Sequence, residues 1–301
     1  MKIVLLGPNG QLGWELQRAL APLGELVALP RLDTAGAPLG DLTQPDALVR
    51  RLRALRPDLV VNAAAHTAVD KAESEPDLAQ TVNATAPGAL ARLMAELDGW
   101  LLHYSTDYVF DGSGSAPRSE DAPTNPQSVY GRSKLDGEQQ VRAAGGRHLI
   151  LRTSWVHAAR GGNFARTMLR LAADREALTV IDDQVGAPTG ADLLADISTH
   201  ALRRALRDPA VAGTYHAVAG GETSWCGYAR HVLEVARRAG VPLKAGPEAV
   251  QPIPTSQYPT PARRPLNSRL DTTRLRSTFD LHLPDWRVGV DRMLTEVLQR
   301  S

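Results

Sequence analysis

The sequence of 301 residues contains a single cysteine, Cys226. One thiol cannot form an intrachain disulfide, which excludes the disulfide-stapled class of secreted domains and favours a protein of the reducing cytoplasm. The early apolar run from Ile3 to Leu6 is far too short for the core of a signal peptide or for a membrane span. We therefore expect a cytoplasmic protein with no membrane partner.

Neither sign of charge is in excess, because the formal net charge is +1. A near-neutral chain has no overall electrostatic attraction to nucleic acid, so no nucleic-acid partner is expected. The eight histidines show no spacing typical of metal ligands, and a catalytic zinc is therefore not expected. Lysine is also scarce, which makes each of the four lysines informative: Lys2, Lys71, Lys134 and Lys244.

What the chain does contain is a regular alternation of short apolar runs and amphipathic stretches. The runs predict strands and the stretches predict helices: strands at 2–6, 26–29, 59–62, 100–105 and 148–153, helices at 12–20, 45–55, 77–97 and 128–143. Continuously apolar strands are typical of parallel sheets buried on both faces. The sequence therefore predicts an α/β protein with a Rossmann-type doubly wound parallel sheet.

Beyond residue 155 the alternation is less regular, and a chain of this length has room for two lobes of roughly 150 residues. We predict a dinucleotide-binding Rossmann domain over residues 1–155. Residues 156–301 are predicted to form mainly a smaller substrate-binding lobe, with some segments returning to the sheet and with helices at 163–171, 191–206, 225–239 and 287–298. The proline-rich stretch from Pro242 to Pro265 cannot be regular helix or central strand, and we predict an ordered binding loop there.

Three glycines follow the first predicted strand and open the first predicted helix. Gly7, Gly10 and Gly13 form the pattern G-x-x-G-x-x-G. The first glycine permits a tight turn, and the others let backbone N–H groups approach a pyrophosphate. The alternative is a tight strand-to-helix turn without a ligand.

A tyrosine and a lysine lie one helical turn apart in Tyr130-Gly-Arg-Ser-Lys134. An ammonium beside a phenol favours the phenolate, so we expect Lys134 to lower the pKa of Tyr130. Tyr130 is then a candidate general acid for a carbonyl oxygen that is being reduced. The alternative is an exposed lysine beside a half-buried tyrosine.

Hydroxyl side chains end the fourth predicted strand, in Tyr104-Ser-Thr-Asp-Tyr-Val-Phe110. The carboxyl ends of parallel strands form the crevice where open α/β sheets bind ligands. Thr106 is the candidate to hydrogen-bond a substrate carbonyl or its oxyanion. Ser105 competes for this role, and the alternative for Ser105 is a hydroxyl that caps the end of the strand.

Together these motifs resemble those of the extended short-chain dehydrogenases/reductases. Within that superfamily the chain is similar, nearly end to end, to the dTDP-4-dehydrorhamnose reductases. The matching strings include Gly10-Gln-Leu-Gly-Trp-Glu-Leu16, Asn62-Ala-Ala-Ala-His-Thr-Ala-Val-Asp-Lys-Ala-Glu73, Arg152-Thr-Ser-Trp155, Asp183-Gln-Val-Gly-Ala-Pro-Thr189 and Tyr258-Pro-Thr-Pro-Ala-Arg-Arg-Pro265.

The resemblance implies reduction of dTDP-4-dehydro-L-rhamnose at C4 to dTDP-L-rhamnose with NAD(P)H, the last step in making this sugar nucleotide for cell-surface polysaccharide. It implies that Tyr130 donates the proton, that Lys134 lowers its pKa and holds the nicotinamide ribose, and that Thr106 tunes the site. By position it implies a dinucleotide site lined by Gly7, Gly10, Gln11, Leu12, Gly13, Asp41, Leu42, Ala63, Ala65, His66, Thr67 and Tyr104.

On the substrate side, the resemblance implies contacts from Thr106, Asp107 and Trp155, although a core position is the alternative for Trp155. The forked donors of Arg263 and Arg264 suit the substrate pyrophosphate, and a solvated basic pair is the alternative. Some family members hold Mg²⁺ with acidic residues at a dimer interface. The matching positions here are Glu15, Asp192 and Glu296, so Mg²⁺ and a homodimer are further expectations.

The second predicted strand indicates which dinucleotide is preferred. Folds that prefer NADH usually end this strand with an acidic residue that accepts from the ribose 2′-OH, whereas this chain has Pro30 followed by Arg31. An arginine there can pair with a 2′-phosphate, and Asp33 is the rival residue that would repel it. We expect NADPH to be favoured and NADH to be accepted.

Two other functions remain open from the sequence. A nucleotide-sugar epimerase or dehydratase shares the scaffold but keeps its dinucleotide bound through each turnover. The regulatory subunit of methionine adenosyltransferase resembles the same reductases and serves only as a binding partner, which the intact Tyr130, Lys134 and Thr106 disfavour.

Overall fold

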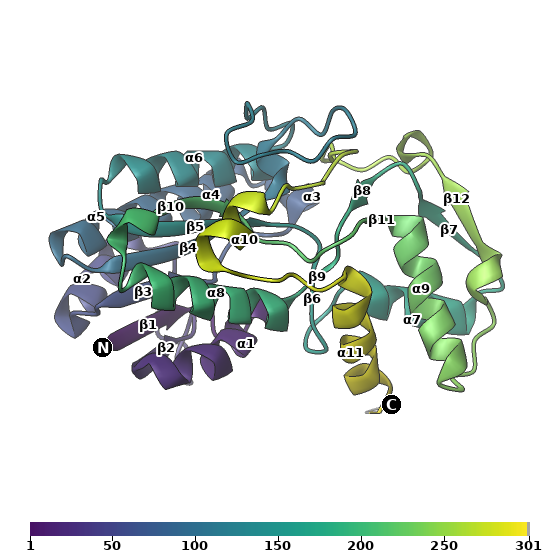
Figure 1. Ribbon diagram of the computed structural model, residues 1–301, viewed down its shortest axis with the longest axis horizontal. Helices are drawn as coiled ribbons and strands as arrows, with labels where there is room; N and C mark the ends of the chain where they lie inside the picture. The colour runs from purple at the N-terminus through teal and green to yellow at the C-terminus, as the bar shows by residue number, and fades with distance from the viewer. Residues whose placement is uncertain (300–301) are drawn as a thin grey trace.

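The computed structural model describes residues 1–299, and its centre is a six-stranded parallel sheet (Figure 1). The strands lie in the order β10-β5-β4-β3-β1-β2. Their bounds are Lys2–Leu6 (β1), Glu25–Leu29 (β2), Leu59–Asn62 (β3), Trp100–Thr106 (β4), Arg147–Thr153 (β5) and Gly213–His216 (β10). The predicted doubly wound α/β fold is confirmed, and each of the five predicted strands begins and ends within one residue of its expected bounds.

Helices cover both faces of the sheet, which explains why its strands are mainly apolar. Ile3 and Leu5 of β1 face one layer and Val4 and Leu6 the other, because successive side chains of a strand point to opposite faces. The first layer contains α1 (Gln11–Leu20), α8 (Ala191–Ala205) and α10 (Thr273–Phe279). The second contains α2 (Pro45–Leu55), α5 (Ala86–Glu96) and α6 (Val129–Ala143).

The helix predicted over 77–97 is not a single α-helix. It consists of α4 (Pro76–Gln80), a π-helical segment over Thr81–Thr85, and α5. Pro87 has no N–H to donate to the preceding turn, which disfavours an unbroken α-helical ladder there. The short α3 (Val69–Ala72) precedes this stretch and was not predicted.

A second hydrophobic core lies in the C-terminal lobe, on the right in Figure 1. It is built by α7 (Phe164–Asp174), α9 (Trp225–Arg238) and α11 (Trp286–Leu298) together with β7 (Leu178–Ile181) and β12 (Val250–Ile253). Short strand pairs connect the lobes: β6 (Val156–His157) with β9 (Thr189–Gly190), and β8 (Val185–Gly186) with β11 (Thr223–Ser224).

The proline-rich stretch is not entirely a loop, because β12 lies inside it and pairs in parallel with β7. Pro252 is tolerated since this two-stranded sheet consists only of edge strands, where a missing N–H costs little. The prediction of a loop throughout 242–265 was therefore wrong over these four residues.

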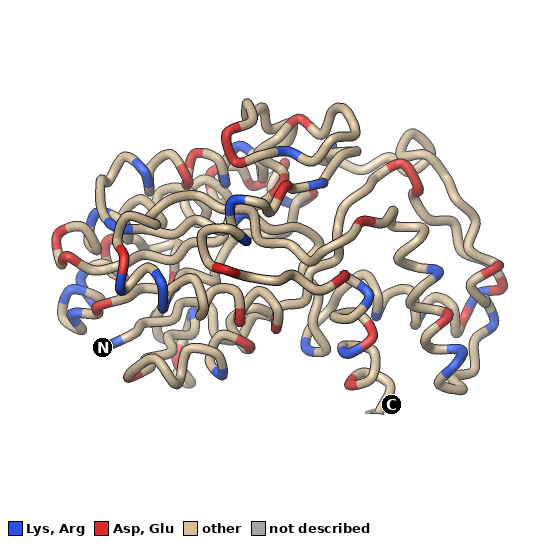
Figure 2. Tube along the Cα trace, in the orientation of Figure 1, with Lys and Arg blue, Asp and Glu red and all other residues tan. Residues whose placement is uncertain are grey.

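Two segments of the C-terminal half return to the Rossmann fold: β10 joins the sheet beside β5, and α8 packs against α1 on one face of that sheet. Lysine, arginine, aspartate and glutamate are interspersed over both lobes (Figure 2). Within residues 1–299, none of the helices has the length and apolar character needed to cross a lipid bilayer.

Candidate active site

The order of the strands reverses at β1, whose neighbours are β2 on one side and β3 on the other. Ligands of open α/β sheets bind at the carboxyl ends of the strands beside such a switch point. Here those ends are followed by Gly7 after β1 and by Ala63, Ala64 and Ala65 after β3. The fold therefore places the predicted glycine loop in a crevice.

The glycines of this loop are required by its geometry. Gly7 has a φ of +77°, and a Cβ at Gly13 would lie 1.9 Å from the Gly7 carbonyl oxygen. Gly13 thus lets α1 pack tightly under the loop. Gly10 precedes α1 and provides no side-chain cap, so the first N–H groups of the helix are left for a ligand. This cradle fits a dinucleotide pyrophosphate.

A cavity of about 550 Å³ opens from the glycine loop toward α6. It is lined by most of the predicted residues: Gly7, Gly10, Gln11, Leu12, Ala63, Ala65, Thr67, Tyr104, Thr106, Asp107, Tyr130, Lys134 and Trp155. Ser105, the competing hydroxyl, also lines it. The structure therefore brings the glycine loop and the tyrosine–lysine pair into one space, although they are more than a hundred residues apart in the chain.

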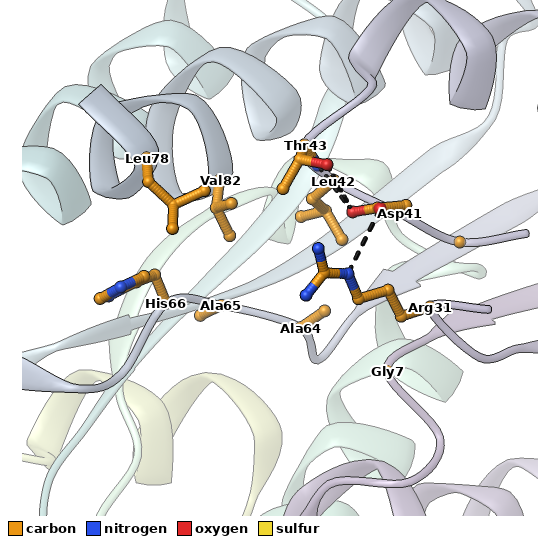
Figure 3. A pocket seen from close by; sticks show the side chains of 11 residues that line it. Gly7, Arg31, Asp41, Leu42, Thr43, Ala64, Ala65, His66, Leu78 and Val82 are labelled. Atoms are coloured by element: carbon orange, nitrogen blue, oxygen red, sulfur yellow. Dashed lines mark hydrogen bonds and ion pairs between the residues drawn. The ribbon is translucent and has the colours of Figure 1, made fainter. Parts of the chain in front are cut away.

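A smaller cavity of about 170 Å³ continues past Gly7 and is lined by Arg31, Asp41, Leu42 and His66 (Figure 3). Arg31 Nε lies 3.2 Å from Asp41 Oδ2. Burial raises the pKa of Asp41, but hydrogen bonds from Thr43 and the Arg31 guanidinium outweigh burial and hold that pKa below its usual value.

The rival residue Asp33 is engaged within its own turn. Its Oδ1 accepts from the backbone N–H groups of Ala35 and Ala37, both at 2.8 Å. Arg31, in contrast, lines the cavity with a side chain that is 70% exposed. A guanidinium is thus available at the position predicted for the ribose 2′-phosphate.

Thr106 and Asp107 line the polar end of the larger cavity. Thr106 Oγ1 donates to Asp107 Oδ1 at 3.0 Å and accepts from the backbone N–H of Tyr108 at 3.2 Å. Burial raises the pKa of Asp107 to about 6, and hydrogen bonds from Ser268 and Thr106 oppose that rise.

Tyr130 packs edge-on against Tyr108, with ring centroids 5.4 Å apart. Burial raises the pKa of Tyr130 above its ordinary value, opposed by a hydrogen bond with Thr106 and reinforced by the charge of Asp107. The net shift of this pKa is upward, opposite to the direction expected from the neighbouring Lys134. The physical reason is that the dry surroundings penalise a phenolate, while Lys134 is engaged elsewhere.

Lys134 is 2% exposed, and its Nζ donates to the backbone carbonyl of Tyr104 at 2.6 Å. Burial lowers the pKa of Lys134 to about 8, and the nearby Glu138 opposes this. Because burial raises the pKa of Tyr130, this side chain is a neutral phenol, which is the protonation state that a proton donor needs.

Trp155 forms the wall between the larger cavity and the C-terminal lobe. Its φ of +49° is unusual for a residue with a side chain, and its indole stacks on that of Trp225 with centroids 3.7 Å apart. Trp225 was not predicted as a site residue. Sequence reasoning placed it at a helix start, where Ser224 caps the helix, but gave no sign that its ring faces a cavity.

Trp225 also lines a third cavity, of about 470 Å³, within the C-terminal lobe. The other lining residues are Phe164, Thr167, Met168, Leu171, Arg175, Leu178, Thr179, Val180, Ile181, Gln184, Tyr258 and Arg264. This space is mainly apolar, with two arginines at its polar parts. None of its lining residues except Arg264 was predicted.

The two candidate arginines differ in their placement. Arg264 lines the third cavity and donates to Asp70 Oδ2 at 2.7 Å. Arg263 is exposed, contacts Gln127 Oε1 at 3.4 Å and lines none of the three cavities described above.

The expected Mg²⁺ site is not supported. Glu15, Asp192 and Glu296 do line one small space of about 30 Å³, but Arg292 also lines it, and its Nη1 lies 3.3 Å from Asp192 Oδ2. Burial raises the pKa of Glu15, opposed by Arg18 and reinforced by the two neighbouring acids. In the part of the chain that the structure describes, no group of three or more His, Cys, Asp or Glu side chains is arranged to hold a metal ion.

Comparison with known proteins decides the family. A family model described as the RmlD substrate binding domain matches residues 1–299. The dTDP-4-dehydrorhamnose reductase of Escherichia coli K12 is 55% identical over 99% of this chain and 98% of that protein. This chain belongs to the dTDP-4-dehydrorhamnose reductase family. The resemblance inferred from the motifs is thereby confirmed, as is the class of enzyme, an oxidoreductase.

Solved structures of the family share the fold. A dTDP-4-dehydrorhamnose reductase from Clostridium acetobutylicum superposes with a TM-score of 0.87 at 34% identity, covering 99% of this chain and 100% of that one. A Bacillus anthracis dTDP-4-dehydrorhamnose reductase, solved in complex with NADP, gives a TM-score of 0.86 at 31% identity, covering 98% and 99%.

Proposed function

We propose that this chain reduces dTDP-4-dehydro-L-rhamnose at C4 to dTDP-L-rhamnose, with NADPH preferred and NADH accepted. The observation that carries the proposal is the position of Tyr130, Lys134 and Thr106 in one cavity that begins at the glycine loop and ends at the tryptophan wall of the C-terminal lobe. Membership of the family supports the same reaction and its place as the last step of dTDP-L-rhamnose synthesis.

The dinucleotide is proposed to lie along the crevice from Arg31 to Lys134. When bound, a reduced nicotinamide supplies the hydride. The N–H groups at the start of α1 would hold the pyrophosphate, since the loop has room there and the helix N-terminus favours negative charge. Arg31 would pair with the 2′-phosphate of NADPH, and Asp41 would remain on the adenosine side.

The sugar is proposed to lie between Tyr130 and Trp155, with its C4 oxygen at the hydroxyls of Tyr130 and Thr106. The nucleotide part would then extend past Trp225 into the third cavity, whose apolar lining suits a base. Arg264, at the polar part of that cavity, would hold the diphosphate. Arg263 is not given this role because it lies outside the cavity.

The chain's own residues supply the proton. Tyr130, neutral in this cavity, donates its phenolic proton: its O–H bond breaks as an O–H bond forms on the C4 oxygen. A general acid of this kind contributes roughly 10²- to 10⁴-fold in rate. Thr106 would turn its single O–H hydrogen from Asp107 Oδ1 to the same oxygen as that oxygen gains negative charge, and would thereby favour the transition state over the ketone.

The protein is further proposed to act in the cytoplasm as a homodimer. The single, buried Cys226 supports a reducing compartment, because no intrachain disulfide depends on oxidation. Light scattering coupled to gel filtration tests the dimer, since it separates a mass of about twice 32.4 kDa from the monomer.

The experiment that tests the proposed function distinguishes a reductase from an epimerase or dehydratase. The purified protein is first analysed for bound dinucleotide, and is then given the 4-keto sugar nucleotide with and without added NADPH. The proposal predicts that product forms only when NADPH is added. Tightly bound dinucleotide, together with conversion that needs no added NADPH, would instead support an epimerase or dehydratase.

A further inference from the structure

A histidine to which the proposed mechanism assigns no role lies directly against the catalytic lysine. His103 of β4 is fully buried, between Asn62 of β3 and Lys134 of α6. Its Nδ1 lies 3.2 Å from Asn62 Nδ2, and its Nε2 lies 3.4 Å from Lys134 Nζ. These three side chains form a polar row from β3 and β4 of the sheet to α6, next to the catalytic cavity.

The row fixes which ring nitrogen carries the proton. The backbone N–H of Ala64 donates to Asn62 Oδ1 at 3.3 Å, so the amide nitrogen of Asn62 faces the histidine. An amide NH₂ group can only donate, so His103 Nδ1 is the acceptor and the ring proton is on Nε2. Burial, reinforced by the charge of Lys134, lowers the pKa of His103 well below its usual value, so the ring stays neutral.

The Nε2–H of His103 therefore points at the nitrogen of Lys134. An ammonium has no lone pair to accept this hydrogen, whereas a neutral amine has one. Lys134 keeps a hydrogen for the Tyr104 carbonyl in both states, because an amine still has two. The geometry thus favours the amine, in the same direction as burial, while Glu138, one turn along α6, favours the ammonium.

We propose that His103 is a positioning residue, which stabilises the neutral amine of Lys134 by donating its Nε2–H to the amine nitrogen. Lys134 then releases a proton easily when the reaction needs one. Lys134 and Tyr130 line the same cavity. After Tyr130 has given up its proton, water in that cavity carries one from the Lys134 ammonium, whose N–H bond breaks, to the phenolate, whose O–H bond re-forms. The resulting amine accepts from His103 until solvent returns a proton to it.

Other groups that face Tyr130 also favour the return of a proton to its phenolate. Burial and the charges of Asp107 and Tyr108 raise its pKa, and the hydrogen bond with Thr106 opposes this rise. A phenolate formed there has a strong tendency to take a proton back. The return of a proton to Tyr130 rests on the proposed reductase function, whereas the effect of His103 on Lys134 does not.

The scarcity of lysine allows a direct test on the intact protein. With ¹³C-labelled lysine, the four side chains give four Cε signals, and Lys134→Arg identifies the one from Lys134. We expect that signal to titrate with a midpoint near 8 in the wild-type protein. Two matched variants then distinguish the roles of the two ring nitrogens of His103. His103→Gln places a donor near the Nε2 position, and His103→Asn places one near the Nδ1 position.

The proposal predicts that His103→Asn raises the Lys134 midpoint by about 0.5 to 1 pH unit, the size expected from losing one hydrogen bond. His103→Gln should restore most of the difference. The alkaline limb of the kcat profile, where Lys134 loses its proton, should move with the midpoint. Equal midpoints in the wild type and His103→Asn, or equal shifts in both variants, would overturn the proposal.

A measurement on the wild type keeps the test valid even if a variant does not fold. The ¹⁵N shifts of His103 should show a bare Nδ1 and a protonated Nε2, and the opposite tautomer would also overturn the proposal. A failure of the His103 proposal can be distinguished from a failure of the proposed reductase function. A protein with the expected titration but no reduction of the sugar nucleotide contradicts the proposed function alone.

Discussion

Lys134 Nζ lies 2.6 Å from the backbone carbonyl oxygen of Tyr104. This bond ties α6 to the end of β4 and directs the lysine toward the strand rather than toward a free phenolate. Tyr130, one turn earlier on α6, is left as a neutral phenol whose pKa is raised by burial. The site is thus prepared to give a proton, as the reduction of a ketone requires.

Replacement of Tyr130 by phenylalanine should remove most of the activity and leave the fold intact. The phenyl ring fills the same space against Tyr108, but no proton donor remains. We expect kcat to fall by roughly 10²- to 10⁴-fold. Steady-state kinetics and a thermal melt measure the two effects. A variant that keeps more than about a third of wild-type kcat would show that Tyr130 is not the donor.

Arg264 and Arg263 form a matched pair of neighbours, one inside the third cavity and one outside it. Arg264→Ala should raise KM for the sugar nucleotide by roughly 10- to 100-fold, the loss expected for a charged hydrogen bond. KM for the dinucleotide should hardly change. Arg263→Ala serves as the control and should have a small effect on both constants. If both arginines mattered equally, or if the dinucleotide KM rose as much, a local folding defect would be the better explanation.

Arg31 should decide the choice between the two dinucleotides. We expect kcat/KM to favour NADPH by roughly 3- to 30-fold, since the guanidinium is exposed and partly engaged with Asp41. Arg31→Ala should abolish that preference while leaving the kinetics with NADH nearly unchanged. Asp33→Asn is the control, because Asp33 already caps its own turn. A wild-type preference for NADH, or a preference for NADPH that survives in Arg31→Ala, would exclude this role for Arg31.

The sequence was sufficient for the parts of the site that depend on local spacing. The glycine triplet lies within one strand-to-helix turn, and Tyr130 and Lys134 lie one turn apart on one helix. The residue spacing alone therefore predicts the geometry of both motifs. Five of the six strands of the sheet were equally predictable, because burial on both faces makes them mainly apolar. Strand β10, with the sequence Gly-Thr-Tyr-His, was not predicted.

Features that depend on contacts between distant segments were not predictable in this way. The third cavity is formed by α7, β7, α9 and the loop around Tyr258, which meet only in the folded chain. The raised pKa of Tyr130 depends on how dry the assembled cavity is, not on the neighbouring lysine. Strand β12 was missed because its proline is acceptable only at the edge of a two-stranded sheet.

The stability of the protein should decrease in acid partly through His216, which is buried and accepts from Arg152 at 3.4 Å. Burial, reinforced by the Arg152 charge, lowers its pKa from 6.5 to about 3. Between these values the unfolded chain binds the proton and the folded chain does not, so the free energy of unfolding falls as the pH falls. This group alone should cost about 3 kcal/mol between pH 7 and pH 4.

Urea denaturation at several pH values measures this effect, with His216→Asn as the comparison. The asparagine amide can still donate toward the Asp271 carbonyl, which the ring now faces through Nδ1 at 3.2 Å. The variant should be about 1 kcal/mol less stable at pH 7 and should lose less stability in acid. Parallel curves for the two proteins would show that His216 does not titrate as described.

The most direct measurement of the central claim follows NADPH oxidation by the purified protein in the presence of dTDP-4-dehydro-L-rhamnose and identifies the sugar nucleotide by NMR. The account predicts one dTDP-L-rhamnose formed for each NADPH oxidised, with a hydrogen from the dinucleotide now at C4. Failure to oxidise NADPH, or conversion of the sugar without net oxidation, would contradict it.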